Sequence, residues 1–89
     1  MQFKIEKQAK EDLKFFKKNN PNLYKKCLKL IEDILEHPES WIWKPEHLKY
    51  FWENIWSRRI NQEHRIVYII DYKNSTIKFI SFRFHYNFK

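Results

Sequence analysis

Residues 55–71 read IWSRRINQEHRIVYIID, in which two runs rich in β-branched and aromatic residues flank a short polar segment. We expect residues 55–60 and 65–71 to be strands, joined by a turn at 61–64. A third strand-like run follows at residues 76–84 after a second polar stretch. Three strands joined in this way predict an antiparallel meander.

The middle strand of this meander should be buried on both faces. Residues 66–70 read IVYII, so both alternating sets of side chains are apolar. Strands of this kind are usually covered on each side of the sheet. We expect helices to cover one face and the segment 39–54 to cover part of the other.

The N-terminal part predicts a short strand followed by a helix. Phe3 and Ile5 alternate with polar neighbours over residues 2–6, which suits a strand. From Lys7 to about Lys18, apolar residues recur at helical spacing, and the helix should end before Pro21.

A second helix should follow at once, because Asn20 or Asn22 can cap it and Pro21 is tolerated in its first turn. Its end is marked by His37 and Pro38. One apolar stripe runs along it, formed by Leu23, Cys27, Leu30, Ile31, Ile34 and Leu35. The two helices therefore predict an antiparallel hairpin with a shared apolar face. Residues 39–54 show no sustained period and predict a long structured loop.

Length and composition indicate an α+β protein of one domain, residues 1–89. The chain has 89 residues, 43% of them hydrophobic, which is enough for one core and too few residues for two. The expected architecture is a short N-terminal strand and a helical hairpin packed on an antiparallel β-sheet.

The net charge and the cysteine content limit the partners and the compartment. Lys and Arg outnumber Asp and Glu by 18 to 11, and a charge of +7 favours a polyanion such as RNA. The single cysteine, Cys27, excludes an internal disulfide and fits a reducing compartment, so we expect a cytoplasmic protein. The sequence has no apolar run of about 18 residues, so no membrane span is predicted.

Cleavage of RNA without a metal requires a base for the ribose 2'-hydroxyl, an acid for the leaving 5'-oxygen, and cations for the phosphate. Glu46 can supply the base, because Lys44 and Lys49 lie near it in sequence and favour its ionised form. His85 can exchange a proton near neutral pH, and Tyr86 can stack on a base.

The cations of this hypothetical site would come from Arg58, Arg59 and Arg65, whose guanidinium groups can bind phosphoryl oxygens in a bidentate way. Adjacent strand residues point to opposite faces, so only one of Arg58 and Arg59 can share a face with Arg65. A symmetric turn selects Arg58, and a bulged turn selects Arg59.

Each of these residues also has an ordinary structural interpretation. Glu46 can be a solvated ion-pair partner, Arg65 a charge at the start of a strand, and the aromatic residues part of the core. The histidines lack ligand spacing with Cys27 or with one another, so no metal or other cofactor is predicted.

The order and spacing of these motifs resemble the Txe/YoeB family of toxin–antitoxin toxins, within the RelE/ParE superfamily. The resemblance is carried by residues 44–46 (Lys-Pro-Glu), 48–49 (Leu-Lys), 56–60 (Trp-Ser-Arg-Arg-Ile) and 63–68 (Glu-His-Arg-Ile-Val-Tyr), and by the later Arg83, His85 and Tyr86. It implies a twisted antiparallel sheet with two N-terminal helices.

The resemblance also implies an activity, which is ribosome-dependent cleavage of mRNA in the A site, with a 2',3'-cyclic phosphate as product. Glu46 would be the general base and His85 the general acid. Arg65 would stabilise the phosphate, with Arg59 favoured over Arg58. Lys49 and Lys44 would bind the substrate, and Tyr86 would position it.

The partners that the resemblance implies are a YefM-like antitoxin, the ribosome with its mRNA, and a second copy in a homodimer. Two alternatives stay open. One is a ParE-like inhibitor of DNA gyrase, which has the fold without the catalytic set. The other is a non-catalytic RNA- or ribosome-binding module, for which charge and aromatic residues suffice.

Overall fold

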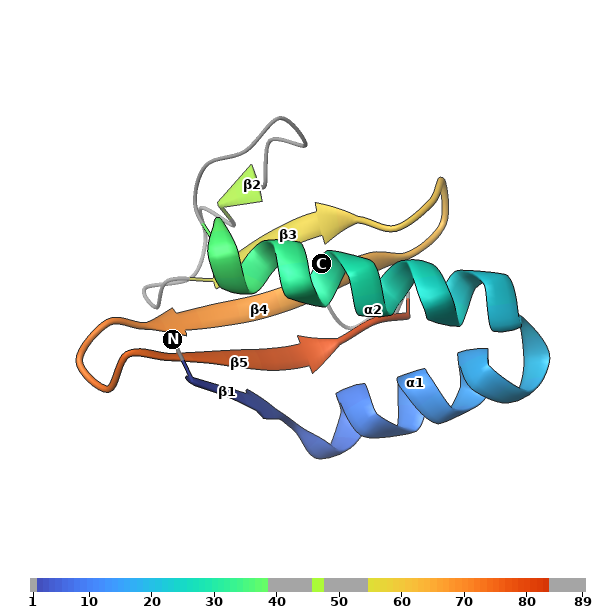
Figure 1. Ribbon diagram of the computed structural model, residues 1–89, viewed down its shortest axis with the longest axis horizontal. Helices are drawn as coiled ribbons and strands as arrows, with labels where there is room; N and C mark the ends of the chain where they lie inside the picture. The colour runs from blue at the N-terminus through green and yellow to red at the C-terminus, as the bar shows by residue number, and fades with distance from the viewer. Residues whose placement is uncertain (1, 39–45, 48–54, 84–89) are drawn as a thin grey trace.

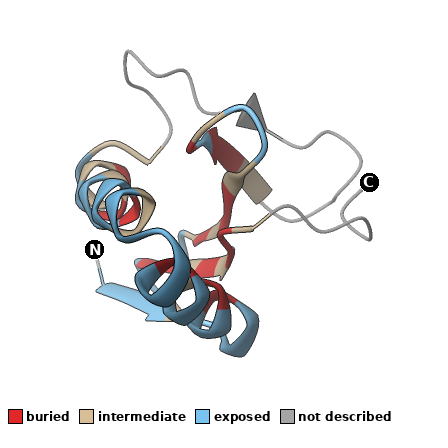
Figure 2. Ribbon diagram, turned by 90° about the vertical axis from the view of Figure 1, so that its right-hand side faces the viewer, coloured by how far each residue is buried: buried red, intermediate tan, exposed pale blue. Residues whose placement is uncertain are grey.

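The computed structural model describes residues 2–38, 46–47 and 55–83. In chain order the elements are β1 (Gln2–Ile5), α1 (Lys7–Asn19), α2 (Pro21–Glu36), β2 (Glu46–His47), β3 (Ile55–Arg59), β4 (Arg65–Asp71) and β5 (Thr76–Ser81). The strands form one sheet in the order β1-β5-β4-β3-β2 (Figure 1). Both helices cover the same face of this sheet (Figure 2). The predicted α+β architecture is confirmed.

The meander β3-β4-β5 is antiparallel throughout, as the sequence predicts. The edge strand β1 differs, because it pairs with β5 in parallel, with Gln2 opposite Thr76 and Ile5 opposite Phe79. The sheet is therefore mixed: the meander is antiparallel, as predicted, and β1 adds a parallel pair whose direction the sequence does not predict. Alternating side chains reveal a strand but carry no information on the direction of its partner.

The segment 39–54 contains a short strand that the sequence does not predict. Glu46 pairs with Ser57 and His47 with Trp56, which extends the sheet beyond β3. Two residues are too few to produce a detectable alternation. The rest of the predicted loop lies outside the described residues, and so does its predicted cover of the sheet.

The turn of the helical hairpin is formed by one residue, Asn20, which lies between α1 and α2. Its backbone N–H donates to the carbonyl of Phe16 (2.7 Å) at the end of α1, and its side chain accepts from the N–H of Leu23 (3.2 Å) in α2. Pro21 begins α2, where its missing N–H costs nothing. Of the two predicted caps, Asn20 is therefore the one used. Neither described helix has the length and apolar character that a membrane crossing needs.

The core lies between the helices and the sheet. Ile66, Tyr68 and Ile70 of β4 are almost fully buried and face the helices, and burial of each such side chain stabilises the fold by roughly 1.5–3 kcal/mol. The other buried members of this cluster are Ala9, Phe16, Cys27, Ile31, Ile34, Ile60, Ile77, Phe79 and Phe82. On the opposite face of β4, Val67 is also buried (8% exposed) and Ile69 is partly so, in line with the prediction for residues 66–70.

Two strands end earlier than the sequence predicts. β3 stops at Arg59 because the N–H of Ile60 donates to the carbonyl of His64 (2.9 Å) and closes the turn. β5 stops at Ser81 and not at residue 84, because the N–H groups of Phe82 and Arg83 donate to a side chain, the carboxylate of Asp12. Phe84 lies outside the described residues.

Candidate functional site

The turn between β3 and β4 determines which arginines share a face of the sheet. Ile60 N and Asn61 N both approach the carbonyl of His64, and the Asn61 side chain accepts from the N–H groups of Glu63 (2.9 Å) and His64 (2.7 Å). This irregular turn places Arg59 directly opposite Arg65. The register is the one expected for a bulged turn, so Arg59, and not Arg58, shares a face of the sheet with Arg65.

Arg59 and Arg65 project from the face of the sheet that the helices leave uncovered. Directly opposite residues of an antiparallel pair have Cβ atoms about 4.5–5.5 Å apart, and like charges at that spacing repel. Arg59 is exposed and Arg65 partly buried, and no described carboxylate forms an ion pair with Arg59. Two arginines at directly opposite positions on one face concentrate positive charge there, and such charge attracts anions.

Arg58 lies on the other face and is engaged in the core. It is 1% exposed, forms an ion pair with Asp33 of α2, and donates through Nη2 to the carbonyl of His37 (3.0 Å). These contacts fasten the end of α2 to β3. The structure thus separates Arg58 from the other arginines that the sequence singles out.

The backbone of Glu46 lies in a row of residues that crosses the sheet. Glu46 is opposite Ser57, Ser57 is opposite Val67, and Val67 is opposite Ser81. Ser57 is two residues from Arg59 along β3, a separation of roughly 6.6 Å. The predicted base thus comes from a strand position one row away from the arginine pair.

The two serines of this row form a floor of small side chains on the face of the sheet away from the helices. Ser57 and Ser81 are 3% and 0% exposed, and within the described part of the chain their hydroxyl groups have no hydrogen-bond partner. Buried hydroxyls usually find a partner, so these two are exceptions among the described polar groups. The floor lies beside the arginine pair.

Four of the predicted site residues lie outside the described residues. They are Lys44, Lys49, His85 and Tyr86. The roles assigned to them remain predictions. His85 and Tyr86 lie two and three residues after Arg83, where the described part of the chain ends.

One residue that the sequence reading did not single out is Asp12. It lies on the core side of α1 and is 0% exposed, although its side chain is acidic. A carboxylate three residues after Ala9 and four before Phe16, on the apolar stripe, is the signal that could have identified it. Its partners are the N–H groups just beyond β5.

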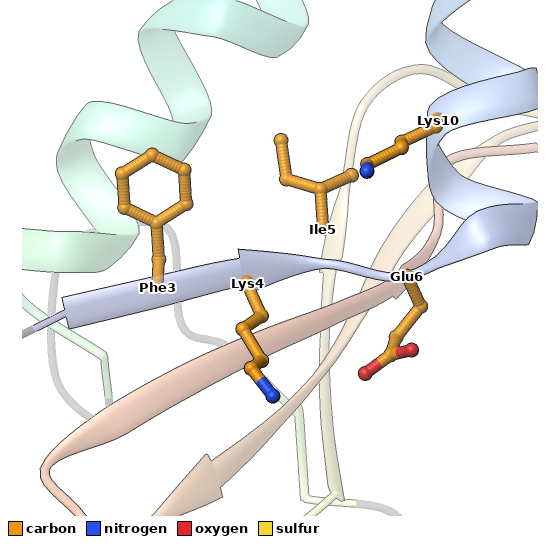
Figure 3. A pocket seen from close by; sticks show the side chains of 5 residues that line it. All are labelled: Phe3, Lys4, Ile5, Glu6 and Lys10. Carbon is orange, nitrogen blue, oxygen red and sulfur yellow. The ribbon is translucent and has the colours of Figure 1, made fainter.

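A shallow depression at the opposite edge of the sheet is separate from these residues. It is lined by Phe3, Lys4, Ile5, Glu6 and Lys10, and Figure 3 shows Phe3 and Ile5 on one side of β1 and Lys4 and Glu6 on the other. Because β1 is the strand farthest from β2, this depression is not part of the candidate site. Within the described residues no cluster of His, Cys, Asp and Glu could hold a metal ion.

Comparison with known proteins relates this arrangement to one group. A family model described as "YoeB-like toxin of bacterial type II toxin-antitoxin system" matches residues 5–86. The toxin YoeB of Synechocystis sp. is 45% identical over 75 residues, which cover 84% of this chain and 85% of the relative.

Two solved structures from Staphylococcus aureus have the same fold. One is a YoeB-YefM complex, with 39% identity, a TM-score of 0.81, and coverage of 97% of this chain and 98% of the other. The second is a YoeB dimer, with 38% identity, a TM-score of 0.82 and the same coverage.

Proposed function

Because the chain belongs to the YoeB family of toxins from bacterial type II toxin–antitoxin systems, we propose that it is a ribosome-dependent mRNA interferase. It would cut mRNA in the ribosomal A site and so inhibit translation. The observation that carries this proposal is the pair Arg59–Arg65 on the uncovered face, one row from the strand position of Glu46. The proposed unit is a single toxin domain over residues 1–89.

The proposed reaction uses the ribose 2'-hydroxyl of the mRNA as nucleophile. Glu46 takes the proton from this hydroxyl, the 2'-oxygen attacks the phosphorus, and the bond from phosphorus to the 5'-oxygen breaks. His85 gives a proton to that 5'-oxygen. The products are a 2',3'-cyclic phosphate and a free 5'-hydroxyl, and no metal is required because both proton transfers are made by side chains.

The arginine pair would stabilise the charge on the non-bridging phosphoryl oxygens. Two arginines at directly opposite strand positions are held on one face by the sheet, so little backbone reorganisation is needed when that charge develops. Lys49 and Lys44 would add positive charge for binding the substrate, and Tyr86 would position the base or the phosphate. Arg58 would contribute through the stability of β3 and not through contact with RNA.

The proposed partners are the ribosome with its mRNA, a YefM-like antitoxin and a second copy of the chain. The net charge of +7 suits both RNA and an acidic antitoxin segment. The S. aureus complex and dimer show that relatives of similar length assemble in these two ways. The proposed site of action is the cytoplasm, where translating ribosomes are found.

The test is a translation reaction with purified toxin in which mRNA 5'-ends are mapped with and without ribosomes. We expect cuts within codons only when ribosomes are present, and a 2',3'-cyclic phosphate at the upstream fragment. Glu46→Ala and His85→Ala should each abolish most cutting. Glu63→Gln is the matched control, because Glu63 is an exposed glutamate in the β3–β4 turn. Absence of ribosome-dependent cuts, or cutting that survives the Glu46→Ala/His85→Ala double change, would refute the proposal.

A further inference from the structure

The carboxylate of Asp12 joins α1 to the chain just beyond β5. Its Oδ2 accepts hydrogen bonds from the N–H of Phe82 (2.9 Å) and from the N–H of Arg83 (3.2 Å), while Oδ1 accepts from Nε2 of Gln8 (3.0 Å). Asp12 is fully buried. One carboxylate oxygen thus holds two consecutive backbone amides, 70 and 71 residues away in the sequence.

The side chains of the same segment are held from α1 as well. The guanidinium carbon of Arg83 lies 3.7 Å from the centre of the Phe15 ring, at cation–π distance. Phe82 is fully buried and stacks on Phe79, with ring centroids 5.9 Å apart. The chain leaving β5 is therefore fixed through its backbone by Asp12 and through its side chains by Phe15 and the core.

Stability alone does not account for a carboxylate at this position. A charged group loses its hydration on burial, and well-packed apolar residues of similar volume often stabilise a core at least as well as buried ions do. What the carboxylate adds is direction, because two amides that share one acceptor define how the backbone turns away from the sheet. This turn occurs two residues before His85 in the sequence.

We propose that Asp12 and Phe15 form a clamp on Phe82 and Arg83 that positions the following residues, His85 and Tyr86, for cleavage. The inference rests on the proposed function, because His85 is the general acid there. Asp12 and Phe15 are positioning residues and do not touch RNA. Small displacements of a catalytic group cost large factors in rate, so a clamp one step away from the chemistry controls the cleavage rate more than the affinity.

The test measures single-turnover cleavage of mRNA on programmed ribosomes, together with the dissociation constant of the toxin for the ribosome. Asp12→Ala should slow cleavage by about 10- to 100-fold and leave the dissociation constant unchanged. Asp12→Asn keeps one acceptor oxygen and should recover most of the rate. Phe15→Ala should slow cleavage by about 2- to 5-fold. Asp71→Asn and Tyr72→Ala are the matched controls, because they alter a carboxylate and a half-exposed ring at the β4–β5 turn, at the other end of β5 from the clamp.

A purely structural role would give a different result in the His85→Ala background. If the clamp acts through His85, Asp12→Ala should have almost no further effect on the residual cleavage of His85→Ala. An equal loss in both backgrounds, or a wild-type rate in folded Asp12→Ala, would overturn the inference. Should circular dichroism show that Asp12→Ala does not fold, Phe15→Ala and its combination with His85→Ala decide in the same way.

The two proposals fail in distinguishable ways. If the wild-type chain makes no ribosome-dependent cut, the proposed function is wrong, and the proposed role of the clamp is wrong as well. If the wild-type chain cuts and the clamp variants cut equally fast, only the clamp is wrong.

Discussion

Arg58 and Arg59 are adjacent in the chain and identical in chemistry, yet they belong to different regions of the molecule. Arg58 faces the helices and is 1% exposed, with Asp33 and the carbonyl of His37 as partners. Arg59 faces the uncovered side and lies opposite Arg65. The comparison teaches that a buried arginine on one face of this sheet holds the fold through an ion pair, whereas its neighbour on the other face is exposed and forms no ion pair with a described carboxylate.

The largest effect should follow the loss of Arg58. Arg58→Met leaves the Asp33 carboxylate without its ion-pair partner, and we expect the free energy of unfolding in urea to fall by about 3 kcal/mol. Arg59→Met should change it by less than about 0.5 kcal/mol. A combined Arg58→Met/Asp33→Leu variant should recover much of the loss, because no charge is then left uncompensated.

The reactivity of the Cys27 thiol gives an independent measurement of the stability lost in Arg58→Met. Burial raises the pKa of Cys27 from 9.0 to about 12, so the thiol stays protonated and unreactive at neutral pH in the folded chain. Arg58→Met should speed its reaction with a thiol reagent, and Arg59→Met should not. Equal labelling rates in both variants would remove the distinction between the two faces.

The next-largest effect concerns activity. Here we expect the loss of Arg59 to matter more than the loss of Arg58. Arg59→Gln should lower single-turnover cleavage by about 10- to 100-fold, because one cation next to the phosphate is lost while the fold is kept. Arg65→Gln should behave in the same way. Arg59→Lys tests geometry at constant charge, since an ammonium group cannot bind two phosphoryl oxygens in the bidentate way of a guanidinium. Unchanged cleavage in Arg59→Gln would show that the uncovered face is not the substrate face.

A smaller effect on the helix side should come from Asn20. Asn20→Ala removes the cap of α2 and should lower the free energy of unfolding by about 1 kcal/mol without changing the cleavage rate of the folded protein. Asn22→Ala is the control, because Asn22 is exposed within α2 and does not cap it. Equal losses in the two variants would contradict the cap.

The smallest effect is expected at Asp71, an exposed carboxylate in contrast to Asp33. Hydrogen bonds from the side chain and backbone of Asn74 lower the pKa of Asp71 below its ordinary value of 3.8. The bonds therefore stabilise the hairpin above pH 3.8, and this contribution is lost as the pH falls through the lowered pKa. An NMR titration should give a midpoint below 3.8 for Asp71, and Asn74→Ala should return it toward that value.

The elements that were predictable are those with a long periodic signal. The stripe of α2 and the apolar runs of β3 and β4 appear at the predicted places, and β4 has the predicted bounds. The two-residue strand β2 and the parallel partner of β1 were not predictable, because neither depends on a local pattern. Both are consequences of where the chain lies after folding.

The candidate site was predictable in composition and only partly in geometry. The sequence restricts the partner of Arg65 to Arg58 or Arg59, but the choice depends on the irregular turn at residues 61–64 and on the hydrogen bonds of Asn61. The apolar stripe of α1 marks Asp12 as unusual, but its role was not predictable, because it binds two backbone amides of distant residues. Backbone donors leave no trace in the amino-acid sequence.

The parallel pairing of β1 with β5 has a consequence for the order of events during synthesis. Residues 2–5 are made well before residues 76–81, the strand with which they pair. Asp12 is likewise made well before Phe82 and Arg83, whose N–H groups donate to its carboxylate. Contacts that span almost the whole chain form late and slowly. We therefore expect the nascent polypeptide to lack this edge of its sheet until residues 76–83 have been made, so that any activity that needs the complete fold appears only late in its own synthesis.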